Sequence, residues 1–264
     1  MEMGIYEFAV YDMMIPTIFL FTLGILYRLS RYLFLYRRTP QPRWRKTSIS
    51  HKIYALVETF VFPIWASIKR TKITFITGIF LLHLLGVIPL LFLLSHHIAW
   101  WSYYFPPYSV LWPLAIPTSA TSSALTVTSP VSPTTGMSWE FVNTIWGPFT
   151  LILNGDVLAI LAIVGASFKL LEKLPKVFRE RLSRVRVGDF TALILLLVIL
   201  VSGYMATHHL PSPDIETYRS VLGIHILFSE ILVIILPFTK FFHFVFGYWY
   251  GKLHEAYDIW RRGL

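Results

Sequence analysis

The chain has 264 residues, of which 55% are hydrophobic and only 14% charged. Several apolar runs approach the roughly 20 residues that a helix needs to cross a bilayer, which excludes a soluble globular protein. The formal net charge is +9, but the basic residues lie in stretches between the apolar runs, so nucleic acid is not an expected partner.

Hydropathy predicts an all-α membrane protein that forms a single transmembrane domain over residues 1–264. The first predicted span lacks a preceding basic region and a small-residue cleavage site, so we expect a retained anchor and not a removed signal peptide. We expect five transmembrane helices, at residues 12–34, 73–97, 148–168, 188–207 and 221–247.

Lys and Arg residues are strongly biased to one side of the predicted spans. Eleven lie in residues 28–72, seven in 169–186 and four in 240–262, and Arg219 is the only other one. The positive-inside rule then predicts an outer N-terminus and a cytoplasmic C-terminus. We therefore expect a multi-pass protein of the cell (cytoplasmic) membrane.

Two connecting segments have distinct compositions. The cytoplasmic segment 50–70, SHKIYALVETFVFPIWASIKR, is too short and too charged to span, and its apolar positions predict an amphipathic helix in the membrane interface. The segment 98–146 has no Lys or Arg and is predicted to be extracellular. It begins with an aromatic belt, WWSYYFPPY, and continues as a Ser/Thr/Pro-rich run.

The histidines are the candidate ligands of a metal or prosthetic group, since no cysteine is present to hold an iron–sulfur cluster or a c-type haem. His225 and His243 are eighteen residues apart in one apolar stretch, which is five turns of an ideal helix. Such a helix would place both imidazoles on one face, roughly 27 Å apart, near the two edges of the hydrocarbon layer. That spacing suits two haems at different depths better than one shared metal.

The second span supplies the partners for these two histidines. His83 has about the same depth as His243, so we pair these two on the inner side. His225 needs an outer partner, which is His97 or the adjacent His96. His97 is fourteen positions after His83 and on nearly the same helix face, so His97 is preferred and the choice stays open.

Two imidazoles per iron fill both axial sites, and such a haem transfers electrons without binding oxygen. The propionates of the inner haem need cationic partners. The candidates are Arg184, Arg186 and Lys240. Intramembrane acids are also expected to be functional, and only Glu230 and Asp156 lie well inside the spans as candidates for proton handling.

The last span, H225ILFSEILVIILPFTKFFH243, resembles that of a known family. The family is the two-haem b-type cytochromes of the nitrate reductase gamma subunit, with histidines eighteen apart around a Pro-Phe-Ser/Thr-Lys/Arg element. Glu230 favours the branch found in sulfite-reductase-linked and heterodisulfide-reductase-like complexes. The segment RVRVGDF, ending at Phe190, is similar to the basic turn before the family's fourth span.

The resemblance implies a membrane cytochrome b subunit of a respiratory complex with two haems b. Such a subunit passes electrons between a quinol, usually menaquinol, and a cytoplasmic iron–sulfur subunit. The terminal substrate and the direction of electron flow would be set by other subunits, so the chain alone is not assigned as an enzyme.

Two alternatives remain open. The family has two ligand histidines ten apart in the second span, but the positions ten before and after His83 are Ile73 and Leu93. His83 then fits either the outer ligand, as the partner of His225, or the inner one, and a single-haem protein is an alternative. The second alternative is a non-redox transporter or membrane scaffold in which the histidines make structural hydrogen bonds.

Overall fold

The computed structural model describes residues 4–38, 48–118, 144–179, 187–239, 241–242, 252–253 and 255–256. These residues are almost entirely helical, and no β-strand is formed among them. Four helical segments are long and apolar enough to cross a membrane: Ile5–Phe34, Lys72–Phe92, Phe190–Thr207 and Ile215–Phe238. The chain is therefore a helical membrane protein, as its composition predicts.

The first span joins α1 (Ile5–Glu7), the π-helix η1 (Phe8–Met13) and α2 (Met14–Arg38). The second joins α4 (Lys72–Thr74), the π-helix η2 (Phe75–Val87) and α5 (Ile88–Phe92). The last two are α8 (Val187–Thr207) and α9 (Ile215–Ile235), the latter followed by the 3₁₀ turn η6 (Leu236–Phe238).

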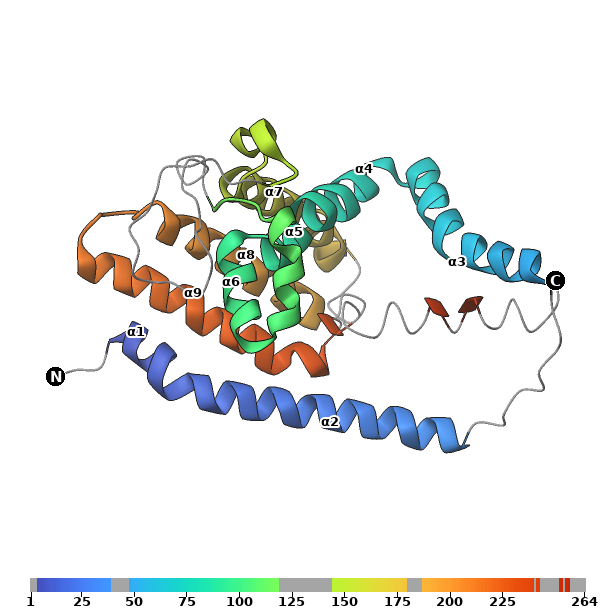
Figure 1. The fold of residues 1–264 in the computed structure, drawn as a ribbon, viewed down its shortest axis with the longest axis horizontal. Coiled ribbons are helices and arrows are strands. Elements are labelled where there is room, and N and C mark those ends of the chain that lie inside the picture. Colours follow the sequence, from blue (N-terminus) through green and yellow to red (C-terminus); the bar gives the residue numbers. More distant parts are fainter. Residues whose placement is uncertain are drawn as a thin grey trace.

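Glycine contacts give the directions of neighbouring helices. A Cβ on Gly223 of α9 would lie 2.7 Å from the backbone of Tyr6, and one on Gly24 of α2 would lie 2.8 Å from Pro237. The first span and α9 therefore run parallel, side by side (Figure 1). On its other side α9 packs against the antiparallel α8, where Gly203 lies against His225.

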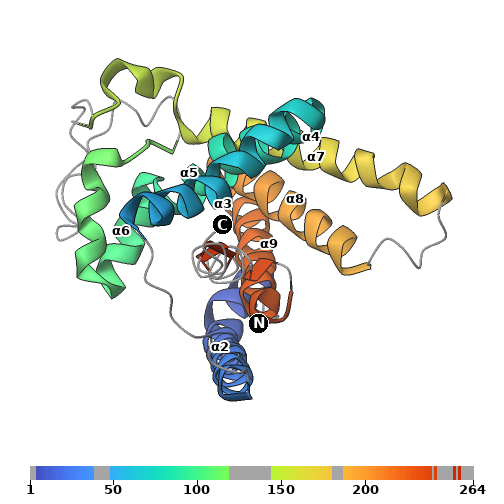
Figure 2. The same ribbon diagram turned by 90° about the vertical axis from the view of Figure 1, so that its right-hand side faces the viewer.

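A further long helix, α7 (Gly155–Arg179), lies between η2 and α8. It runs antiparallel to η2, because Gly86 meets Ala162 whereas Gly78 meets Lys169 further along α7. Figure 2 shows α7, α8, α9 and α2 succeeding one another across the molecule. The predicted span 148–168 corresponds to the 3₁₀ turn η5 (Gly147–Leu151) and the first half of α7. Charged residues enter the later turns of α7, so it is not among the four apolar spans.

Two predicted helices are interrupted. We expected one helix through 73–97, but the chain leaves the helix at Leu94, whose ψ is 135°, and restarts as α6 (Ser95–Tyr104). Backbone hydrogen bonds between Ile116 and both Leu93 and Ser95 stabilise this break. Likewise α9 ends at Ile235, and Thr239 is extended with ψ of 177°, so the chain from 225 to 243 is not one continuous helix. Pro237, which has no N–H to donate, lies at this end.

The segments outside the spans are partly helical. Residues 50–70 lie in α3 (Ile49–Arg70), which Figure 1 shows extending away from the helices around α9. Its exposed side chains include Ile53, Val57 and Trp65. The predicted extracellular segment 98–146 begins with most of α6 and then the 3₁₀ helix η3 (Pro106–Leu114). Its Ser/Thr/Pro-rich run lies mostly outside the described residues.

Candidate functional site

The imidazoles of His96 and His97 interact electrostatically with that of His225, which lies in the middle of α9 and not near a membrane edge as expected. His96 and His97 come from the first turn of α6, with ring centroids 4.1 Å apart. The pKa of His97 is lowered overall. Burial is the largest cause and lowers it, the hydrogen bond to the Leu90 carbonyl raises it, and the electrostatic interaction with His225 lowers it. The pKa of His96 is lowered too, first by burial and then by His97 and His225. Both His96 and His97 therefore interact electrostatically with His225, and the pairing of His97 with His225 stays a prediction.

The helix break at Leu94 positions this group. Because the chain bends there, His97 does not continue the face of η2, and the fourteen-residue spacing from His83 does not describe its direction. The π-helical turns of η2 change the angle per residue further. The preference for His97 over His96 thus had a wrong geometric basis, and both imidazoles interact electrostatically with His225. The two histidines differ in their hydrogen bonds. Nδ1 of His97 bonds to the Leu90 carbonyl oxygen, whereas Nδ1 of His96 lies 3.3 Å from Thr118 Oγ1.

Each of the three candidate ligands in the described residues has its Nδ1 hydrogen-bonded to a backbone carbonyl oxygen. The distances are 2.6 Å from His83 to Gly78, 2.6 Å from His97 to Leu90 and 2.9 Å from His225 to Ile199. A neutral imidazole with its proton on Nδ1 keeps the Nε2 lone pair available. Metal-ligating histidines are held in this way, so the donor set fits an axial ligand of haem.

The imidazole of His225 occupies the groove left by a glycine of α8. A Cβ on Gly203 would lie 2.8 Å from Cε1 and 3.0 Å from Nδ1 of His225. Ser202 Oγ is 3.4 Å from the same Nδ1 and also donates to the Val198 carbonyl. Two neighbouring α8 residues therefore fix the ring plane of His225 from one side.

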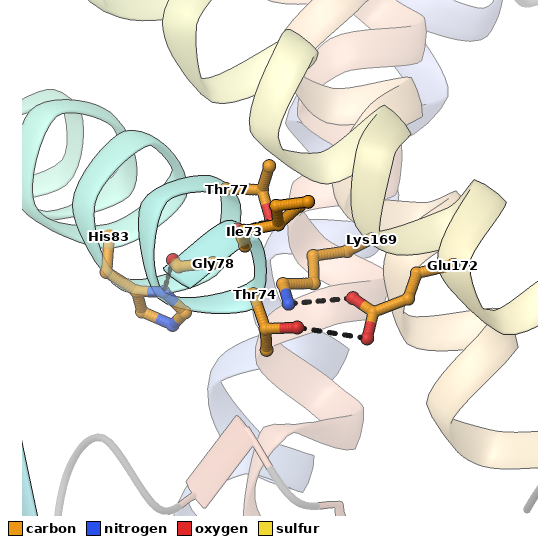
Figure 3. Close-up of polar contacts among 7 residues, drawn as sticks. All are labelled: Ile73, Thr74, Thr77, Gly78, His83, Lys169 and Glu172. Carbon is orange, nitrogen blue, oxygen red and sulfur yellow. Dashed lines mark hydrogen bonds and ion pairs between the residues drawn. The ribbon is translucent and has the colours of Figure 1, made fainter. Parts of the chain in front are cut away.

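His83 lies on an exposed face of η2, and its hydrogen bond to Gly78 spans five residues, as the π-helical register allows. Figure 3 shows Gly78 between the His83 ring and the side chain of Lys169. Lys169 Nζ is 2.9 Å from Glu172 Oε2, and Thr74 Oγ1 donates to Glu172 Oε1 at 3.2 Å. The bond from Thr74 joins α4 to α7, and Lys169 lies against Gly78 of η2, whose carbonyl binds His83. Lys169 is a cation that the sequence analysis did not single out.

The remaining predicted inner-site residues lie outside the described residues: His243, Arg184, Arg186 and Lys240. The pairing of His83 with His243 therefore stays a prediction. A basic residue missed by the sequence analysis is Arg28 on α2, which donates to the Pro237 carbonyl and lies 5.3 Å from the Phe242 ring centroid. Its position at the predicted cytoplasmic end of the first span was the available signal.

The two predicted proton-handling acids have different surroundings. Asp156, in the first turn of α7, pairs with His208 at the end of α8, with Asp156 Oδ1 2.9 Å from His208 Nε2. About a third of the His208 side chain is exposed. Tyr204 packs on the His208 ring at a centroid distance of 4.4 Å. The carboxylate–imidazole pair was missed because its members are 52 residues apart in sequence.

Glu230 lies on a different side of α9 from His225. It follows His225 by five residues, which is about 140° around an α-helix. Gly223 contacts the backbone of Tyr6 in α1, and Pro237 contacts Gly24 of α2. Glu230 is seven residues from each of them, so it lies on the face of α9 that contacts the first span. Glu230 is buried, and neither carboxyl oxygen has a hydrogen-bond partner among the described residues. Asp156 is therefore connected to the α8 side of the site and Glu230 is not.

Among the described residues, no group of three or more His, Cys, Asp or Glu side chains is placed to hold a metal ion. A bis-imidazole haem would need only two axial imidazoles and no such group. Comparisons of the chain with protein-family models, curated proteins and solved structures found no match to any of them.

Proposed function

We propose that the chain is a membrane cytochrome b subunit that passes electrons between a quinol and a cytoplasmic iron–sulfur subunit. His97 and His225 would be the axial ligands of an outer haem. His83 and His243 would hold an inner haem, with Arg184, Arg186 and Lys240 near its propionates. Bound haem supplies a one-electron couple, and the protein holds the imidazoles in the ligating tautomer and keeps the site within the membrane.

The observation that carries this proposal is the shared arrangement of His83, His97 and His225. A lone intramembrane histidine can satisfy itself by any hydrogen bond, but here all three place Nδ1 on a backbone carbonyl, the arrangement in which Nε2 carries the lone pair that a metal needs. The electrostatic interaction between the imidazoles of His97 and His225 further supports their pairing. The quoted resemblance of residues 225–243 to the two-haem family points in the same direction.

A topology of five spans with an outer N-terminus agrees with the helix directions. The first span and α9 are parallel, while η2 and α7, and then α8 and α9, are antiparallel. Counting α7 as the third span gives five alternating crossings that end with this parallel pair. The Lys and Arg bias then places the N-terminus outside and residues 240–264 in the cytoplasm. The chain would lie in the cell membrane, with α3 along its inner surface.

Quinol oxidation releases protons as well as electrons, so the quinone site needs a proton acceptor. The Asp156–His208 pair is our candidate, because a carboxylate oriented on an imidazole can accept a proton and pass it to solvent. It lies at the ends of α7 and α8 that face the predicted outer side. Menaquinone is the expected quinone class by the family resemblance.

A reduced-minus-oxidised absorption spectrum of the purified full chain tests the proposal. We expect b-type α-bands, and a pyridine haemochrome assay should give two haems per chain, or one if the inner site is empty. His225→Ala and His97→Ala should each remove the same haem, while His243→Ala should remove the other. His209→Ala is a matched control, because His209 is an exposed outer histidine that packs on Tyr218.

The second candidate is a non-redox transporter or scaffold, and one observation favours it. The bond from His225 to Ile199 links α9 to α8, which is what a structural histidine would do. In that case the difference spectrum is featureless, and His225→Ala weakens the contact between the two helices without removing any chromophore.

A further inference from the structure

The large apolar side chains of α3 lie on an exposed face of that helix. Ile49, Ile53 and Val57 follow one another at four-residue intervals along one side, and each is more than 40% exposed. Ala55 and Thr59 lie about 160° around the helix from Val57 and are each 1% exposed. The face with small side chains is therefore covered, and the face with large apolar side chains is open.

Chain connectivity holds α3 at a membrane surface. The first apolar span ends at Phe34 and the second begins at Lys72, so residues 35–71 connect two successive spans. Both ends of this connection lie on the same side of the membrane. Only Thr71 separates α3 from the second span, and its φ of −136° and ψ of 58° interrupt the helix there. Figure 1 shows α3 turned away from the direction of α4, so its open face lies beside the bilayer and not across it.

Cations flank this apolar face. Lys69 Nζ is 4.9 Å from the centroid of the Trp65 ring one turn earlier, and both side chains are exposed. An indole with a cation over it suits the headgroup region, where the ring lies in the interface and the ammonium group reaches phosphate. Lys72 is exposed as well. Residues 37–72 contain nine Lys or Arg and a single acid, Glu58, so their charge is complementary to an anionic surface.

We propose that α3 binds the headgroups of anionic phospholipids. Ile49, Ile53 and Val57 lie at the boundary between headgroups and acyl chains, while Lys69 and Lys72 bind lipid phosphates. A basic segment beside an apolar helix that is tethered at the membrane favours anionic lipid as its partner, because both the apolar burial and the charge are then satisfied by one surface. This binding does not depend on the proposed haem.

Fluorescence quenching by brominated lipids tests the proposal in the full chain, which has no cysteine of its own. A fluorophore on Val57→Cys is measured in phosphatidylcholine vesicles that contain equal small shares of brominated phosphatidylglycerol or brominated phosphatidylcholine. We expect quenching by both, and several-fold more by brominated phosphatidylglycerol, because the cations enrich anionic lipid around α3. High salt should remove most of this preference. A fluorophore on Ser212→Cys, in the turn before α9, should show no preference between the two lipids.

Charge variants separate anionic recognition from contact with lipid in general. Lys69→Gln combined with Lys72→Gln should lower the preference for phosphatidylglycerol several-fold, whereas Lys69→Arg with Lys72→Arg should keep it because the charge is retained. A thermal melt checks that each variant is folded.

Absence of quenching by either lipid would overturn the proposal and leave a protein as the partner of this face. Equal quenching by the two lipids, or an unchanged preference in the glutamine variant, would also overturn it. The measurement requires no haem. An absorption spectrum of the same sample therefore reports separately on the proposed cytochrome.

Discussion

The imidazole of His225 packs directly on the backbone of Gly203, with 2.8 Å between its Cε1 and the position that a Cβ would take. At this contact α9 contributes the side chain of His225, and α8 contributes Gly203, which has no side chain. The contact also aligns Nδ1 of His225 with the Ile199 carbonyl, one turn earlier on α8.

Gly203→Ala should displace the His225 ring and weaken haem binding at the outer site. The methyl group would require the ring to move by several tenths of an ångström, which alters its bond to Ile199. Changes in the groups that orient a metal ligand lower affinity about 10- to 100-fold. Haem titration of the apoprotein measures this, and Val201→Ala, at an exposed position on α8, is the control. Unchanged affinity would show that His225 is not a ligand.

Gly165→Ala should destabilise the contact between η2 and α7. A Cβ there would lie 2.8 Å from the Thr77 carbonyl oxygen and 2.9 Å from the Leu82 nitrogen, and both belong to the backbone, which cannot move aside easily. Overpacking of this kind costs about 1–3 kcal/mol. Thermal unfolding in detergent should show a lower midpoint than Val164→Ala, whose side chain is exposed on the same helix. An equal midpoint for both variants would argue against close packing at Gly165.

The sequence predicted the apolar helices well but not their interruptions. Hydropathy averages over about twenty residues, so it located the four apolar spans without detecting the break at Leu94 or the end of α9 at Ile235. The break depends on backbone bonds to Ile116, which is more than twenty residues away in sequence. Angles counted along a supposed continuous helix were unreliable for that reason.

The candidate site was predictable where one residue type carried the signal. Histidines in or next to apolar spans are rare and polar, so His83, His97 and His225 could be selected as candidates, but the choice between His96 and His97 relied on a helix face that the break at Leu94 interrupts. The Asp156–His208 pair needed the packing of separate helices, which no local pattern encodes.

Asp156→Asn and His208→Gln should each slow haem reduction by a menaquinol analogue. If this pair accepts quinol protons, loss of either member removes general base catalysis, which contributes about 100-fold or more. Stopped-flow absorbance at the b-type band measures the rate, with haem content unchanged in both variants. His209→Gln changes the adjacent outer histidine and should keep the wild-type rate. A similar loss in that variant would indicate a general disturbance of the turn between α8 and α9.

Single cysteines introduced into this cysteine-free chain should report its orientation. Ser212→Cys, in the turn before α9, should react with an impermeant maleimide added outside intact cells. Ser50→Cys, near the start of α3, should react only after the membrane is opened. The reverse pattern would place the N-terminus inside, and labelling of both positions from outside would contradict an odd number of crossings between them.

The first turn of α9 should lose stability in acid. Asp214 caps this helix, and its Oδ1 accepts a hydrogen bond from the Thr217 amide at 2.8 Å. Bonds with Ser212 and Thr217 lower the pKa of Asp214 from 3.8 to about 2. Because the folded-state pKa is the lower one, the stabilisation is complete above pH 3.8 and is lost as the pH falls towards 2.

Hydrogen exchange of the Thr217 amide, corrected for the intrinsic effect of pH, measures this cap. Wild-type protection should fall between pH 5 and 2, whereas Asp214→Ala should lack the protection throughout. Asp214→Asn keeps a capping oxygen but carries no charge, so its protection should hardly vary with pH. Equal pH dependence in Asp214→Asn and the wild type would assign the effect to another group. The cap would then hold α9 only through its neutral hydrogen bond.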